Sequence, residues 1–226
     1  MVLMERELEA VVAFTIAFLT MCVIGKILNG VPGKYVIIHS LANICVAVLS
    51  YEDAMQVLLK PSGAMEQRAR VEPLAIVVAI HAYHVCFFRI TDADVLHHVV
   101  MVVGTVPANA FYHCGLLVNL CSFSICGAPG AICYFAIALR KNSFITRTCE
   151  KRVNAAVNTW FRTPLITITA YVIFMITQDS HLNYQMLVAF LVFWNGQYYG
   201  RQVVENYGAH VGRLDNAPRT PPPKAC

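Results

Sequence analysis

The stretch AVVAFTIAFLTMCVI (residues 10–24) contains no charged residue, proline or glycine. It lies inside an apolar run over residues 8–28, and about 20 such residues cross the hydrocarbon core of a bilayer. Glu5, Glu7 and Glu9 make the preceding segment acidic, and no small-residue cleavage site follows, so we expect a retained helix rather than a targeting segment. This stretch therefore predicts a membrane-spanning helix and, with it, an integral membrane protein.

The composition of the whole chain favours the same class. Of its 226 residues, 58% are hydrophobic and 13% are charged, against roughly 45–50% and about 25% in soluble domains. The net charge of +4 comes from basic residues scattered over short loops, without the basic stripe and interleaved aromatic residues of a nucleic-acid-binding surface. We expect no nucleic-acid partner; the expected partners are membrane lipids and other membrane subunits.

Apolar segments follow one another along the chain and predict an all-α, polytopic transmembrane helical bundle of about seven spans (six to seven). The turn between the fourth and fifth must fall near residues 107–113, and a second breaker, GAPG at 127–130, predicts a kink or a break inside the fifth. We assign residues 1–204 to the bundle and residues 205–226 to a polar, Pro-rich tail. The predicted spans are 8–28, 35–59, 73–90, 95–112, 115–139, 163–178 and 184–200.

Basic residues divide unevenly between the two faces that seven spans create. Of the seventeen Lys and Arg, four lie on the side of the N-terminus, and these are Arg6, Lys60, Arg68 and Arg70. The rest lie on the side of the C-terminus. Since positive charge accumulates on the cytoplasmic or equivalent side, we expect the C-terminus there, facing the cytoplasm or an organellar matrix.

The loop at 140–162 is too polar to cross a membrane. Its apolar residues alternate with basic ones, as in an amphipathic helix that lies in the headgroup plane. A connector whose charges only fix the topology is the alternative. The candidate residues for binding lipid headgroups are Arg140, Lys141, Arg147, Lys151 and Arg152.

Ionisable residues inside membrane spans are costly to bury and are therefore functional candidates. Most of those in this chain are histidines. Neutral imidazoles can also simply join helices by hydrogen bonds. Besides the adjacent pair discussed next, the candidates to line a cavity for lipid are His39, His81, Tyr83, His84 and His113.

The segment TDADVLHHVVM (residues 91–101) allows two interpretations. Thr91 as N-cap with Asp94 at the third helical position forms a capping-box variant. In the other interpretation, Asp94 lies three and four residues before His97 and His98 and orients one of them as a general base. Neighbouring side chains on a helix diverge by about 100°. We therefore expect that one of the two histidines faces a cavity and that they do not chelate one metal together.

The sequence offers little support for a metal or cofactor. The H-E-x-x-H motif and the repeated H-x-x-H-H boxes of di-iron membrane enzymes are absent, and we expect no metal site. The alternative is a haem-binding or metal-binding redox protein, because histidines on different helices can ligate a haem iron. Its ligands would come from His39, His81, His84 and His113.

Three segments together give a resemblance to a known family. YVIIHSLANICVAVLS (35–50), AIHAYHVCFF (79–88) and DVLHHVVM (94–101) resemble the TLC-domain family of multi-spanning proteins, which includes the ceramide synthases and the translocating-chain-associating membrane proteins. The resemblance implies a TLC-like bundle in the endoplasmic reticulum, with an organellar inner membrane as the alternative. It also implies that His97, His98 and Asp94 would form the acyl-transfer centre if the protein is an enzyme.

The chain departs from the family pattern at two places. His84 follows Tyr83 where the family often has an aspartate, and no acidic residue follows the adjacent histidines until Glu150. A catalytic base needs an orienting partner, so the set is incomplete. We therefore expect a non-catalytic membrane protein that binds lipid or serves as an accessory subunit of a larger membrane complex. The alternative is a lipid acyltransferase of the ceramide synthase type.

Overall fold

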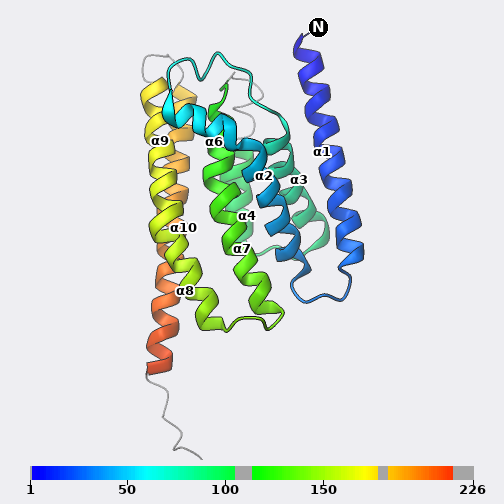
Figure 1. Cartoon of the computed structure of the whole chain (residues 1–226), viewed down its shortest axis with the longest axis vertical. Coiled ribbons are helices and arrows are strands. Elements are labelled where there is room, and N and C mark those ends of the chain that lie inside the picture. The colour runs from blue at the N-terminus through cyan, green and yellow to red at the C-terminus, as the bar shows by residue number, and fades with distance from the viewer. Residues whose placement is uncertain (1, 105–113, 178–182, 216–226) are drawn as a thin grey trace, which may run out of the picture.

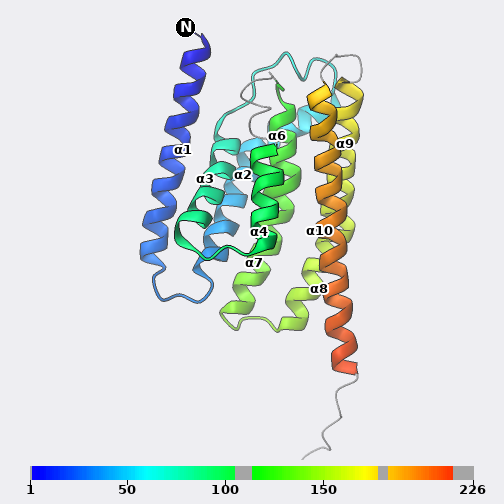
Figure 2. The same ribbon diagram turned by 180° about the vertical axis from the view of Figure 1, so that it is seen from behind.

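The computed structural model describes residues 2–104, 114–177 and 183–215, and these form a bundle of roughly parallel helices (Figures 1 and 2). The described ranges contain no strand, so the predicted all-α class is confirmed. The predicted turn near 107–113 and residue His113 lie outside the described residues. In chain order the elements are α1 (Val2–Ile27), α2 (Lys34–Leu59), α3 (Glu72–Phe87), α4 (Asp92–His97), η1 (His98–Val103), α6 (Leu117–Ser122), η2 (Phe123–Gly127), α7 (Ala128–Lys141), α8 (Arg147–Val157), η3 (Asn158–Arg162), α9 (Thr163–Thr177) and α10 (Asn183–Asp215).

Length and composition identify fewer membrane-crossing helices than the sequence predicted. Among the described residues, four helices are long and apolar enough to cross a membrane: 5–27, 34–59, 117–141 and 147–177. The helix α3 is apolar but has 16 residues, which falls short of a typical span. The prediction of about seven spans thus exceeds what these criteria support.

The helix α1 packs mainly against α3 at one edge of the bundle (Figures 1 and 2). Tyr83 of α3 fills their interface, and a side chain on Gly25 of α1 would collide with its hydroxyl group. The helix α1 also exposes large apolar side chains such as Val11 and Ile16. Such a surface fits a lipid environment better than water.

The GAPG segment (127–130) changes the local hydrogen-bonding pattern of its helix from α-type to π-type but does not end the helix. From Leu117 to Lys141 the chain is continuously helical, and the turn before the segment is the π-type element η2. Pro129 lacks the N–H that would bond to the carbonyl group of Ile125 in an α-helix. Pro129 therefore leaves the Ile125 carbonyl group without its α-helical donor, while α6, η2 and α7 remain one continuous helix.

Glycines allow close packing of this helix and of α10. A side chain on Gly130 would come within 2.6 Å of Asn43 Nδ2 on α2. A side chain on Gly196 of α10 would come within 2.7 Å of Ile166 Cγ2 on α9. These small residues bring the backbones together as expected for helix contacts in membranes.

The segment 140–162 does not form a separate helix across the bundle. The helix α7 continues to Lys141, and from Arg147 onwards α8, η3 and α9 form one continuous helix to residue 177. The helix α10 also extends past residue 204 to Asp215, so the first part of the segment assigned to the tail is helical and projects beyond the other helices (Figure 1).

Candidate functional site

The histidines of α3 and α4 meet in the interior of the bundle. His81 Nδ1 lies 2.6 Å from the carbonyl oxygen of Val77, which can only accept, so this nitrogen carries the proton. His81 Nε2 lies 3.2 Å from His97 Nε2. With both rings neutral, His97 donates from Nε2 to His81, and the two side chains join α3 to α4.

His84 and His98 lie beside this pair at the same helix contact. The ring centroid of His98 lies 5.0 Å from that of His81 and 5.3 Å from that of His84, with edge-to-face geometry in both cases. His84 also stacks on Tyr35 at 4.4 Å. Thus α3 and the α4–η1 helix bring four of the predicted histidines together.

His39 approaches the same region from α2. Its ring stacks on Tyr134 of α7 with centroids 3.7 Å apart, and its Nδ1 lies 3.1 Å from Asn43 Nδ2. Tyr83 does not line this region. It packs in the α1–α3 interface described above.

Asp94 has the geometry of a helix cap. Its carboxylate accepts from the Thr91 backbone N–H at 2.8 Å and from the Thr91 hydroxyl at 2.7 Å, while its own N–H bonds to that hydroxyl. The capping box is therefore present. Among the described residues, the hydrogen bonds of the Asp94 carboxylate are with Thr91 and not with a histidine. The hydrogen-bond partner of His97 is His81.

A polar chamber of about 300 Å³ adjoins the histidine pair, which forms part of its lining. Residues from eight elements surround it, and these are α2, α3, α4, η2, α7, α8, η3 and α10. The polar residues that line it are His39, Asn43, His81, Asp94, His97, Tyr134, Asn154, Asn158, Arg162 and Tyr199.

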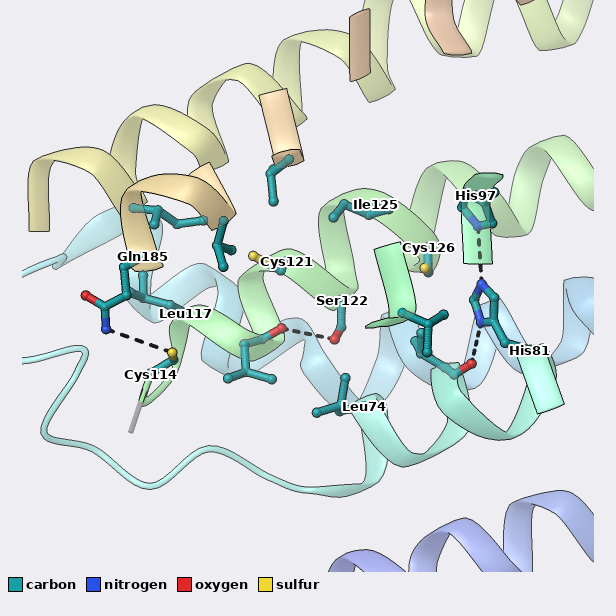
Figure 3. Close-up of a pocket in the computed structure, with 16 residues that line it drawn as sticks. Leu74, His81, His97, Cys114, Leu117, Cys121, Ser122, Ile125, Cys126 and Gln185 are labelled. Atoms are coloured by element: carbon teal, nitrogen blue, oxygen red, sulfur yellow. Dashed lines mark hydrogen bonds between the residues drawn. The ribbon is translucent and has the colours of Figure 1, made fainter. Parts of the chain in front are cut away.

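An apolar pocket of about 80 Å³ lies on the other side of the pair, with His81 and His97 at one end and Cys114 and Gln185 at the other (Figure 3). Aliphatic side chains such as Leu117 and Ile125 form most of its wall. The polar chamber and the apolar pocket share four lining residues, His81, His97, Ile125 and Cys126.

Arg162 is a cationic residue of the chamber lining, and three hydrogen bonds position its guanidinium group. Its Nη2 donates to Asn195 Oδ1 at 3.0 Å, its Nη1 to Asn158 Oδ1 at 3.4 Å, and its Nε to the Ile125 carbonyl at 3.4 Å. The last acceptor is the one that Pro129 leaves without its usual donor. The proline thus helps to hold the guanidinium group at the chamber.

The predicted headgroup-binding residues gather around the connection between α7 and α8. Arg140 Nε lies 3.3 Å from Glu150 Oε2, and Lys151 Nζ donates to Asn206 Oδ1 at 2.7 Å. Lys141, Arg147 and Arg152 are exposed. These cations are at one end of the bundle, outside the polar chamber.

Sequence reasoning missed the residues that α8, η3 and α10 contribute to the chamber. The sequence places Arg162 only among the basic residues on the side of the C-terminus, and its pattern does not single out Tyr199. One signal was available, because Asn154, Asn158 and Arg162 repeat at a spacing of four residues and therefore share a helix face.

The described residues contain no group of three or more His, Cys, Asp or Glu side chains arranged to hold a metal ion. Comparison with known proteins adds no further guide: no protein-family model, curated protein or solved structure matches the chain significantly. The resemblance to the TLC-domain family accordingly stays a prediction from the sequence segments.

Proposed function

We propose that the chain is an integral membrane protein, with a TLC-like bundle of about seven crossings, that binds an amphipathic lipid in its interior. The observation that carries this proposal is the wall of His81, His97, Ile125 and Cys126 between the apolar pocket and the polar chamber. Apolar chains gain free energy by leaving water, whereas a polar group must find hydrogen-bond partners when it is buried. One amphipathic molecule satisfies both cavities.

The arrangement of the helices supports the proposed crossings. α1, α3, α4–η1, α6–α7, α8–α9 and α10 run roughly along the long axis of the bundle, and α2 runs obliquely to it (Figures 1 and 2). The connection over 60–71 lies at one end, and the connection over 142–146 lies at the other, on the side where α10 ends (Figure 1). The second end carries most of the basic residues, which favours the cytoplasmic or matrix side for it.

A substitution that fills the apolar pocket with a larger side chain tests lipid binding. Val188 on α10 lines the apolar pocket, and Val204 on the same helix is 44% exposed. We expect native mass spectrometry of the full chain to detect a co-purified lipid, Val188→Phe to lose it, and the matched control Val204→Phe to keep it. If the filled pocket retains the same lipid at full occupancy, the apolar pocket is not its binding site.

Acyl transfer is a second candidate, favoured by the place of His97. It lies in the wall between pocket and chamber, where the linkage between the tail and the polar end of a bound lipid would be. His97 would take the proton of an attacking amine or hydroxyl while the acyl–sulfur bond of an acyl thioester breaks and the thiol leaves. His81, rather than Asp94, would orient it.

The test of the second candidate uses purified protein with an acyl thioester and a long-chain amine. Turnover that His97→Ala abolishes without loss of lipid co-purification would establish transfer. Turnover that survives His97→Ala would remove His97 as the base, and an inactive wild type would leave lipid binding as the function.

A further inference from the structure

Arg162 lacks an acidic partner. Its guanidinium group lies against one carbonyl group and two asparagine side chains, all neutral. It forms no ion pair with any described carboxylate. The acidic side chains outside the described part of the chain are those of Asp179 and Asp215. A cation held inside a membrane bundle without a counter-charge is unusual, because such groups normally pair.

The carboxylates of the neighbouring elements are engaged elsewhere. Asp94 lines the chamber, but its carboxylate is bound by Thr91. Glu150 pairs with Arg140 and accepts from Asn154 Nδ2 at 2.7 Å. The hydrogen bonds from Thr91 leave the charge of Asp94 in place, so the chamber contains one capped carboxylate and, in Arg162, one cation that forms no ion pair with a described carboxylate.

Further donors beside Arg162 have no partner within the described part of the chain. The Tyr199 hydroxyl, on a residue that lines the chamber, is buried without a hydrogen bond, and so is Nδ2 of Asn195. Asn195 is fully buried at 0% exposure and accepts from Arg162 through its other atom. Asn154 Oδ1, on a residue that lines the same chamber, is a buried acceptor without a donor. Buried polar atoms are normally satisfied, so these groups together indicate a polar ligand, and the two unpaired donors beside Arg162 favour an acceptor at that end of it.

We infer that the polar chamber recognises an oxyanion, a carboxylate or a phosphate, on the head of the bound lipid. This inference rests on the proposed lipid-binding function and adds the charge of the ligand. Arg162 supplies charge-assisted hydrogen bonds to the oxyanion, and Tyr199 adds a neutral one. The carbons of the lipid tail next to the head occupy the apolar pocket beside His81 and His97, since its volume of about 80 Å³ holds only a short part of a tail.

Equilibrium binding of radiolabelled oleate tests the inference, with the full chain in nanodiscs of phosphatidylcholine and monoolein as a neutral competitor with the same tail. We expect the wild type to prefer oleate. Arg162→Gln should weaken oleate binding roughly tenfold to hundredfold, and Tyr199→Phe roughly twofold to tenfold. Monoolein binding should stay unchanged in both variants.

Arg201→Gln is the matched control, because Arg201 is exposed on α10 and pairs with Glu205 at 2.7 Å. It should leave oleate binding unchanged. A second arm adds an excess of inorganic phosphate, which should not displace oleate because it lacks the tail. Displacement would show a site for soluble anions and overturn the lipid assignment.

The outcomes separate this inference from the proposed function. Equal affinity of the wild type for oleate and monoolein would overturn the anionic head and leave lipid binding in place. Failure of both lipids to bind would remove the proposed function itself. If Arg162→Gln does not fold, the wild-type preference and its decrease in Tyr199→Phe decide the matter, and an unchanged preference in that variant counts against the inference.

Discussion

His81 Nε2 and His97 Nε2 lie 3.2 Å apart where α3 meets α4, in the wall between the apolar pocket and the polar chamber. Because His81 Nδ1 is bound to the Val77 carbonyl, the direction of the hydrogen bond between two neutral rings is fixed. The partner of His97 is thus another imidazole from a different helix.

This contact predicts unequal effects of the two adjacent histidines on stability. His97→Ala removes the partner of His81 Nε2, and an unsatisfied buried polar atom costs about 1–3 kcal/mol. His98→Ala should cost less, since the contacts of His98 are ring contacts with neighbouring histidines. Unfolding of both variants in mixed detergent micelles measures the difference. Equal losses would show that the His81–His97 contact does not stabilise the fold.

The capping box at the start of α4 predicts coupled effects of Thr91 and Asp94. Either Thr91→Ala or Asp94→Ala should lower the free energy of unfolding by about 0.5–2 kcal/mol. The double variant should lose little more than one single variant, because the two side chains form one motif. Thr91→Ser keeps the hydroxyl and is the control. Additive losses in the same unfolding assay would contradict the capping box as the role of Asp94.

Much of the helical organisation could be predicted from hydrophobic runs and their breakers. The second predicted span, 35–59, corresponds to α2 at Lys34–Leu59, because Gly33 before it and Pro61 after it interrupt the helix. The predicted break at GAPG becomes a π-type turn instead. A proline inside a packed bundle can keep its helix when the freed carbonyl finds another donor, and here Arg162 supplies one.

The site could be predicted only in part, because its residues come together through helix pairing. The sequence predicts His81, His84, His97 and His98 as ionisable residues within apolar segments, and the structure places them together. Arg162 was not found, because its partners Ile125 and Asn195 are distant in sequence. The packing of Tyr83 against α1 could not be predicted from the local sequence pattern, since it depends on how closely α1 approaches α3 at Gly25.

The proposed seven crossings predict that the two chain ends face opposite sides of the membrane. Epitope tags at the N-terminus and the C-terminus should differ in protease sensitivity in sealed vesicles of known orientation, with the C-terminal tag on the cytoplasmic or matrix side. An even number of crossings would place both tags on one side. Equal protection of the two tags would therefore rule out seven crossings.

Close packing between α9 and α10 predicts that two glycines of the same helix respond oppositely to alanine. A side chain on Gly196 would come within 2.7 Å of Ile166 Cγ2, whereas one on Gly208 meets nothing within 4 Å. Gly196→Ala should destabilise by about 1–3 kcal/mol through overpacking. Gly208→Ala should stabilise by up to about 1 kcal/mol through helix propensity.

The double variant Gly196→Ala with Ile166→Ala separates overpacking from any other cause. Ile166→Ala alone removes a buried side chain and should cost about 2–5 kcal/mol. It also makes room for the added methyl group, so the double variant should lose less than the sum of the single losses. Unfolding in detergent micelles measures all four variants. A Gly196→Ala chain as stable as Gly208→Ala would contradict the packing of α9 on α10.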